Sequence, residues 1–370
     1  MPSTHHPALE ESLFANAAAD LDRALVDRRD LDSWSDAWIA PAERWSKAVW
    51  DRAVELGPLP VASEDLAAGR CVANAPVYVC GAPRSGTTLV RDLLDGHPAL
   101  SVLPAEGKFF EQFSEPSPDT SSARGVHAQR WLKLLANPNH QRPFWLLGPC
   151  DSEAGAYASF ARAFLTWNEA LADQGLAFRL QPAAALSLAV AAGQDVLRLR
   201  RSVDKSPGYE FHAAAIWAHH PDAKLIHLVR HPAAIAASYS TGLARAKLNS
   251  TPVSRMLRNV VSSLIAGWRA AHLAPLNHLF VRYEDLVADR RKEMARIASF
   301  LDVEWDDCLL RQTILGLPAE PNTSFHGIAR RQFRPKNAKE WSWLAVASTC
   351  HALLAKGPAT GASAPAQSPS

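Results

Sequence analysis

The sequence of 370 residues contains little of several chemically distinctive features, and each shortage excludes a class of protein. Its five cysteines are odd in number, and no two have the spacing of a metal site or a redox motif. A reducing, cytoplasmic compartment is therefore expected, and a disulfide scaffold is not. The formal net charge of only +2 does not indicate nucleic acid or a membrane surface as a partner.

Long hydrophobic runs are also missing. No uncharged apolar stretch of about 18 residues occurs, so no transmembrane segment is expected. The first residues, Met-Pro-Ser-Thr-His-His, lack the basic region and apolar core of a signal peptide. With 48% hydrophobic residues, the chain still has ample material for a large globular core.

The composition divides the chain into three parts. Residues 1–72 are expected to form a helical extension, in which tryptophans separated by nearly whole helical turns indicate a packed core face: Trp34, Trp38, Trp45 and Trp50. Residues 73–345 form the main domain. Its segment 109–200 is expected to be a helical insert that serves as a lid over a pocket, as a layer covering a sheet, or as both. Residues 356–370, rich in Ala, Gly, Ser and Pro, are expected to be disordered.

The most informative segment is 77–89, Val-Tyr-Val-Cys-Gly-Ala-Pro-Arg-Ser-Gly-Thr-Thr-Leu. A short apolar run leads into a turn with two glycines, and an amphipathic stretch follows. This pattern predicts a strand, a glycine turn and the start of a helix. Such a turn points several backbone N–H groups and the positive end of a helix dipole at one spot, which therefore binds an oxyanion.

The glycine spacing is that of a nucleotide-binding P-loop, G-x4-G-K-[ST], but the lysine is replaced. Thr87 stands at the lysine position and Thr88 at the hydroxyl position, while the cation is Arg84, inside the loop. A kinase that polarises a γ-phosphate would normally keep the lysine. A donor without a γ-phosphate would not need it, and a guanidinium suits bidentate contact with an oxyanion. A P-loop kinase stays as an alternative interpretation.

The loop also resembles the sulfotransferases that use 3′-phosphoadenosine 5′-phosphosulfate (PAPS), most closely the branch that includes the tyrosylprotein sulfotransferases and many bacterial enzymes. The resemblance implies a P-loop-like α/β fold, a three-layer sandwich whose central, mainly parallel sheet is flanked by helices, with 73–345 as the catalytic domain. It assigns the 5′-phosphosulfate end of the donor to the loop residues Pro83, Arg84, Ser85, Gly86, Thr87 and Thr88.

Two later blocks match the same family. Residues 223–230 predict a strand that ends in Arg230, and Pro232 then opens a helix that carries Ser238. The resemblance places Arg230 and Ser238 on the 3′-phosphate. Residues 279–286 predict another strand followed by a helix that ends near Trp305. At their junction Tyr283 either contacts the adenine, as the resemblance implies, or is a core tyrosine.

Transfer of a sulfuryl group needs a base for the acceptor proton and cations for the developing charge. The resemblance implies that the base is Glu106, which follows a strand predicted over residues 100–103. His97 is the alternative base, because its ordinary pKa suits proton transfer. The resemblance places Lys205, in Lys-Ser-Pro, on the leaving oxygen. Since Arg84 and Lys205 supply the positive charge, no metal is expected.

The last block, from Asn322 to Trp341, is rich in cations and would ordinarily be a solvated basic loop. In the family, a segment of this kind folds over the donor. The resemblance then places Ser324 at the sulfate or 5′-phosphate end of the donor, and Arg331 and Lys339 near its 3′-phosphate.

The sequence thus predicts a PAPS-dependent sulfotransferase. The expected acceptor is a hydroxyl, less readily an amine, of a small molecule, lipid or sugar. Protein tyrosine does not carry over as acceptor, because the membrane anchor of the tyrosylprotein enzymes has no counterpart here. A non-catalytic nucleotide-binding module, whose amino-terminal helices dock a partner, is the second alternative.

Overall fold

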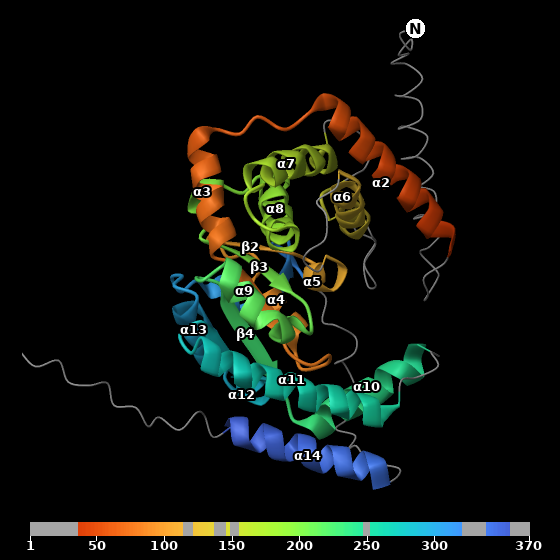
Figure 1. Ribbon diagram of the computed structural model, residues 1–370, viewed down its shortest axis with the longest axis vertical. Coiled ribbons are helices and arrows are strands. Elements are labelled where there is room, and N and C mark those ends of the chain that lie inside the picture. The colour runs from red at the N-terminus through yellow and green to blue at the C-terminus, as the bar shows by residue number, and fades with distance from the viewer. Residues whose placement is uncertain are drawn as a thin grey trace, which may run out of the picture.

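The computed structural model describes residues 36–113, 121–136, 146–148, 155–246, 252–319 and 338–355. Its centre is a five-stranded parallel sheet in the order β2-β3-β1-β4-β5 (Figure 1). The strands are β1 (Val77–Cys80), β2 (Leu100–Val102), β3 (Arg201–Lys205), β4 (Lys224–Val229) and β5 (His278–Arg282). Helices flank this sheet, so the predicted α/β fold is confirmed.

Side chains of β1 alternate between two separate cores, as the pleat of a strand requires. Val77 and Val79 pack with the helix that follows the glycine turn, α4 (Thr87–Leu94), and with α13 (Arg290–Phe300). Tyr78 belongs to the core on the other face, together with the helical insert. The sheet is therefore the middle of three layers, and its central strand leads directly into the loop singled out by the sequence.

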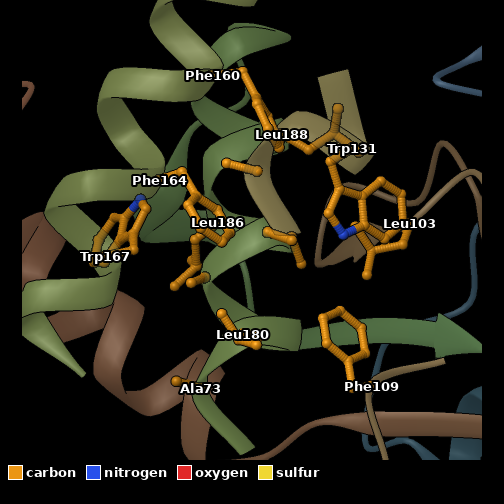
Figure 2. Packing of buried hydrophobic residues seen from close by; sticks show 14 of the residues in the cluster. Ala73, Leu103, Phe109, Trp131, Phe160, Phe164, Trp167, Leu180, Leu186 and Leu188 are labelled. Carbon is orange, nitrogen blue, oxygen red and sulfur yellow. The ribbon is translucent and has the colours of Figure 1, made fainter. Parts of the chain in front are cut away.

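The layer beside Tyr78 is built from helices of the amino-terminal extension and the insert. They are α2 (Asp36–Leu56), α3 (Ser63–Asn74), α5 (Phe109–Gln112), α6 (Ser121–Ala136), α7 (Ala156–Ala170) and α8 (Leu176–Ala191). Trp45 and Trp50 are buried in this core, as the tryptophan spacing indicates. Figure 2 shows Phe164 and Trp167 of α7 packed beside residues of α8, with Trp131 of α6 in the same cluster. Residues of the extension and of the insert belong to the same hydrophobic cluster, so the two share one core.

Helices also cover the end of the sheet farthest from α7 (Figure 1). There α10 (Pro232–Ala246), α11 (Val253–Leu273) and α14 (Ala338–Ala355) pack on one another through a third apolar cluster. The remaining elements are η1 (Val196–Arg198), η2 (Tyr209–His212), α9 (Ala213–His219), η3 (Asp307–Leu310), β6 (Thr313–Ile314) and β7 (Leu317–Pro318). Both strand–helix units expected after residue 222 are present.

One helix boundary differs from the sequence prediction. The single helix expected from Tyr283 to near Trp305 is two helices, α12 (Tyr283–Ala288) and α13, which ends at Phe300. The side chain of Asp289 accepts a hydrogen bond of 3.0 Å from the backbone N–H of Lys292 and starts the second helix. An aspartate that satisfies a free N–H in this way competes with helix continuation. Residues 1–35 of the predicted helical extension and the tail 356–370 lie outside the described residues.

Candidate functional site

The glycine turn follows β1 and uses backbone conformations that only glycine adopts easily. Gly81 and Gly86 have φ values of 129° and 108°. A Cβ atom on Gly81 would lie 2.4 Å from the carbonyl oxygen of Leu228, and one on Gly86 would lie 2.5 Å from the ring of Tyr283. The chain therefore passes close to β4 and to the start of α12 before it enters α4.

Four predicted residues from four segments meet beside this turn, and we call them the arginine cluster: Arg84, Arg230, Ser238 and Tyr283. The Nε of Arg84 donates to Ser238 Oγ over 3.2 Å, and Arg230 Nη1 donates to the carbonyl of Arg84 over 3.1 Å. The guanidinium of Arg230 lies 4.1 Å from the centre of the Tyr283 ring. Burial, and then Arg230, lower the pKa of Arg84. Two neighbouring guanidiniums repel each other, which makes this a favourable place for an anion.

A second group lies at the carboxyl ends of β2 and β3. Lys205 Nζ donates to Glu106 Oε1 over 2.8 Å, and Lys108 Nζ lies 3.4 Å from Glu106 Oε2. Burial alone would raise the pKa of Glu106, but Lys205 and then Lys108 outweigh it, and the net shift is downward. Burial and the nearby Arg91 lower the pKa of Lys205, although Glu106 offsets part of this effect. Glu106 is therefore ionised at neutral pH.

Hydrogen bonds join the two chain segments that carry Glu106 and Lys205. The N–H of Gly107 donates to Asp204 Oδ1 over 3.0 Å, and the N–H of Lys108 donates to Ser206 Oγ over 3.0 Å. Tyr209 donates its hydroxyl hydrogen to the other oxygen of Asp204. Burial raises the pKa of Asp204 to about 6. The position of Glu106 is thus fixed by hydrogen bonds from the backbone N–H groups of the two residues that follow it, Gly107 and Lys108.

Arg130, from α6 of the helical insert, completes this arrangement. Its guanidinium donates to the carbonyl oxygens of Glu106 and Gly107, each over 2.7 Å. No motif in the sequence points to Arg130, because its role depends on the packing of α6 against a loop far away in the chain. No motif indicates the role of Asp204 either, although it stands next to Lys205 in the sequence.

His97 and the carboxyl-terminal candidates are placed differently. His97 is buried where α4 ends, with the N–H of Ala99 donating to Nδ1 over 3.2 Å and Nε2 lying 3.0 Å from the carbonyl oxygen of Glu304. Both ring nitrogens are thus engaged in local structure. Lys339 is exposed in the first turn of α14, which packs on α10 and α11. Ser324 and Arg331 lie outside the described residues.

Two features are absent from the described segments. Within them, no group of three or more His, Cys, Asp or Glu side chains is arranged to hold a metal ion. None of the helices in this part of the chain combines the length and the apolar character needed to span a bilayer.

A parallel sheet whose central strand enters a glycine turn, with cations gathered at the carboxyl ends of the strands, defines a P-loop-like α/β protein built to bind an anion. A family model described as "Sulfotransferase family" matches residues 76–307. The chain therefore belongs to the sulfotransferase family. The matched range contains the glycine turn, the arginine cluster and both members of the Glu106–Lys205 pair.

Similar solved structures include the sulfotransferase domain of the Synechococcus PCC 7002 olefin synthase, at 24% identity and a TM-score of 0.45, covering 74% of this chain and 94% of that one. Sulfotransferase STF1 from Mycobacterium tuberculosis has 15% identity and a TM-score of 0.37, with coverages of 81% and 86%. The Alicyclobacillus acidocaldarius sulfotransferase has 16% identity and a TM-score of 0.37, with coverages of 67% and 87%. No curated protein matches the chain. The family assignment rests on the family model.

Proposed function

We propose that this protein transfers the sulfuryl group of PAPS to a hydroxyl of a small-molecule, lipid or carbohydrate acceptor, with Glu106 as general base. The observation that carries the proposal is the Glu106–Lys205 pair, 2.8 Å long, at the end of a strand adjacent to β1. A carboxylate that can take a proton and an ammonium that can stabilise a leaving oxygen are the two groups the reaction needs beside an anion cradle.

The residues around the glycine turn fit a donor with two separate anionic ends. The turn offers backbone N–H groups at the start of α4, which suit a 5′-phosphate. The arginine cluster holds two half-buried guanidiniums whose mutual repulsion a second phosphate would relieve. Within the cluster, the ring of Tyr283 contacts the Arg230 guanidinium and lies close to Gly86, and we assign the adenine of the donor to this ring. We assign the 3′-phosphate to Arg230 and Ser238. Ser324, Arg331 and Lys339 stay predicted donor contacts.

In the proposed reaction, Glu106 accepts the proton of the acceptor hydroxyl while the acceptor oxygen bonds to sulfur. The bond between sulfur and the bridging phosphate oxygen breaks in line, and Lys205 stabilises the negative charge left on that oxygen. When Lys205 turns to the phosphate, it no longer lowers the pKa of Glu106, and that pKa rises although Lys108 still opposes the effect of burial. Glu106 therefore becomes a stronger base at the moment when a base is needed. Arg130 and Asp204 keep its backbone in place.

Isothermal titration with 3′-phosphoadenosine 5′-phosphate (PAP) tests the donor assignment. We expect PAP to bind far more tightly than ADP in the presence of chelator, and more tightly than ATP with Mg²⁺. Equal affinity for PAP and ADP would contradict the assignment of Arg230 and Ser238. Tighter binding of ATP with Mg²⁺ would favour a kinase instead.

A screen with radiolabelled PAPS against hydroxyl and amine acceptors then tests transfer, with the Glu106→Gln variant as the matched control. A variant that keeps PAP affinity but loses transfer supports catalysis. A wild-type protein that binds PAP and transfers to no acceptor would favour a non-catalytic module. The cytoplasmic location stays a prediction.

A further inference from the structure

A buried carboxyl group that the proposed reaction does not use lies beneath the glycine turn. Glu210, in η2, is only 3% exposed. Its Oε2 accepts the N–H of Gly81 over 3.2 Å and the N–H of Gly208 over 3.1 Å. Ser263 of α11 donates its hydroxyl hydrogen to Oε1. Among the described residues, no cation forms an ion pair with this carboxyl, which instead takes part in hydrogen bonds with backbone N–H groups, the Ser263 hydroxyl and the Cys80 thiol.

The two amides that share Glu210 belong to the two loops that carry the chemistry. Gly81 opens the glycine turn, and Gly208 follows Lys205 by three positions. Strands β1 and β3 are paired at Val79 and Lys205, and the last hydrogen bond between these chains runs from Ser206 N–H to the carbonyl of Val79 over 3.1 Å. Beyond that point the chains diverge. Glu210 is the contact that joins them again after the sheet has ended.

We propose that Glu210 is a positioning residue that sets the distance between the glycine turn and Lys205. It does so by binding one amide from each side with a single carboxyl oxygen. Lys205 is thereby held within reach of an oxyanion in the turn. This inference depends on the proposed function only for the identity of that oxyanion.

The burial of Glu210 agrees with a role that depends on the position of its carboxyl group and not on its charge. Burial raises the pKa of Glu210, and the hydrogen bonds from Ser263 and Gly81 offset only part of that increase. An acidic group placed behind an anion cradle would weaken anion binding through its charge if it were ionised. The neutral carboxamide of glutamine should therefore replace it. Its oxygen can accept both amides, and its NH₂ can donate to Ser263, whose hydroxyl can then turn to His227 Nε2, 3.3 Å away.

A double-mutant cycle on PAP affinity tests this role. In the wild-type background, Glu210→Ala should weaken PAP binding about tenfold, because Lys205 is displaced from the phosphate. In a Lys205→Met background the same change should weaken binding less than about twofold, because the displaced group is already gone. Equal losses in both backgrounds would show that Glu210 does not act through Lys205, and the proposal would be wrong.

Two further variants test whether the effect of Glu210 comes from the position of its carboxyl group, from its charge or from the stability of the protein. Glu210→Gln should stay within about twofold of the wild-type affinity; a loss as large as that of Glu210→Ala would overturn the proposal. Arg201→Met is the matched control, since Arg201 makes buried hydrogen bonds to the Leu301 and Asp222 carbonyls at the opposite end of β3. It should lower the melting temperature and leave PAP affinity unchanged. If it weakens PAP binding as Glu210→Ala does, general loosening explains both and the inference fails.

Where Glu210→Ala does not fold, Glu210→Asp serves in the cycle, since it keeps the acid and withdraws its oxygens by one methylene. If the wild-type protein does not bind PAP, the proposed function is wrong. The role of Glu210 is then tested by a measurement on the protein without a ligand. Amide hydrogen exchange at Gly81 and Gly208 should then accelerate together in Glu210→Asp, while β5 keeps its protection. Exchange that accelerates at one amide alone, or at neither, would overturn the inference.

Discussion

The two halves of the site handle charge in opposite ways. In the arginine cluster, like charges lie side by side, and burial together with Arg230 lowers the pKa of Arg84. In the Glu106–Lys205 pair, opposite charges are already in contact over 2.8 Å. The first arrangement is relieved when an anion arrives, whereas the second must be opened before it can act. One half is therefore organised for binding and the other for a chemical step.

The supports of the two halves differ as well. The arginine cluster is held by contacts among its own members: Arg84 with Ser238, and Arg230 with the Tyr283 ring and the Arg84 carbonyl oxygen. Glu106 is instead held through its backbone, by Arg130 on carbonyl groups and by Asp204 on the following N–H. Backbone support leaves the carboxylate itself able to exchange partners. This difference predicts that changes in the arginine cluster affect binding, and that a change of the Glu106 carboxylate affects turnover.

The largest effect is expected for Glu106→Gln. Loss of the base should reduce transfer by roughly 10³-fold, within the range typical of general base removal. PAP affinity should change little, because the arginine cluster and the glycine turn are intact. Turnover with PAPS and titration with PAP are the two measurements. A variant that loses both together would mean that the halves are not separable in the way proposed.

Arg230→Ala should give the complementary result. Removal of a charged hydrogen-bond donor should weaken PAP binding by about 2 to 3 kcal/mol while ADP binding changes much less. Turnover at saturating PAPS should stay close to wild type. Ser238→Ala is the milder companion, since it removes only a neutral hydroxyl. A similar loss for ADP and PAP would remove the 3′-phosphate from this cluster.

The sequence predicts the glycine turn and the arginine cluster better than the residues that support Glu106 and Lys205. The glycine turn is a local structure, because Gly81 through Thr88 fix their own backbone path, and the strand before and the helix after them were predicted correctly. Arg230, Ser238 and Tyr283 could be predicted because the strand–helix units that carry them resemble those of the sulfotransferases. Arg130 and Glu210 could not be predicted, since the role of each depends on a contact with a loop more than twenty residues away in the chain. The helix break at Asp289 was missed because the apolar periodicity continues across it and hides the capping aspartate.

Acid should distinguish β4 and β3, the two strands that flank β1. His227 of β4 is fully buried, and burial lowers its pKa from 6.5 to about 3. The unfolded chain binds a proton below pH 6.5 and the folded chain does not, so stability is complete above that pH and is lost as pH falls toward 3. Between pH 7 and pH 5, this histidine alone should cost about 2 kcal/mol. Urea unfolding of His227→Leu should show a pH dependence smaller by that amount.

Asp204 on β3 has the opposite sign. Its pKa is raised from 3.8 to about 6, so the folded chain holds a proton that the unfolded chain has lost, and stability falls as pH rises from 3.8 through 6. Hydrogen exchange should therefore show β3 better protected at about pH 5 than at pH 7, relative to β4. If both strands lose protection in parallel on acidification, His227 and Asp204 do not contribute to stability with opposite signs.

The smallest effect is expected for Lys108→Met. The contact between Lys108 and Glu106 is 3.4 Å long, and both side chains are about one-third exposed or more, at 42% and 34%. Such an exposed pair contributes only about 0 to 1 kcal/mol, so transfer at neutral pH should change less than about threefold. Lys108 does, however, help to lower the pKa of Glu106. Its removal should shift the acidic limb of the turnover profile toward higher pH, and the same limb should vanish in Glu106→Gln. An unchanged limb in Lys108→Met would mean that Lys205 alone keeps Glu106 ionised, which would narrow the catalytic half of the site to a single ion pair.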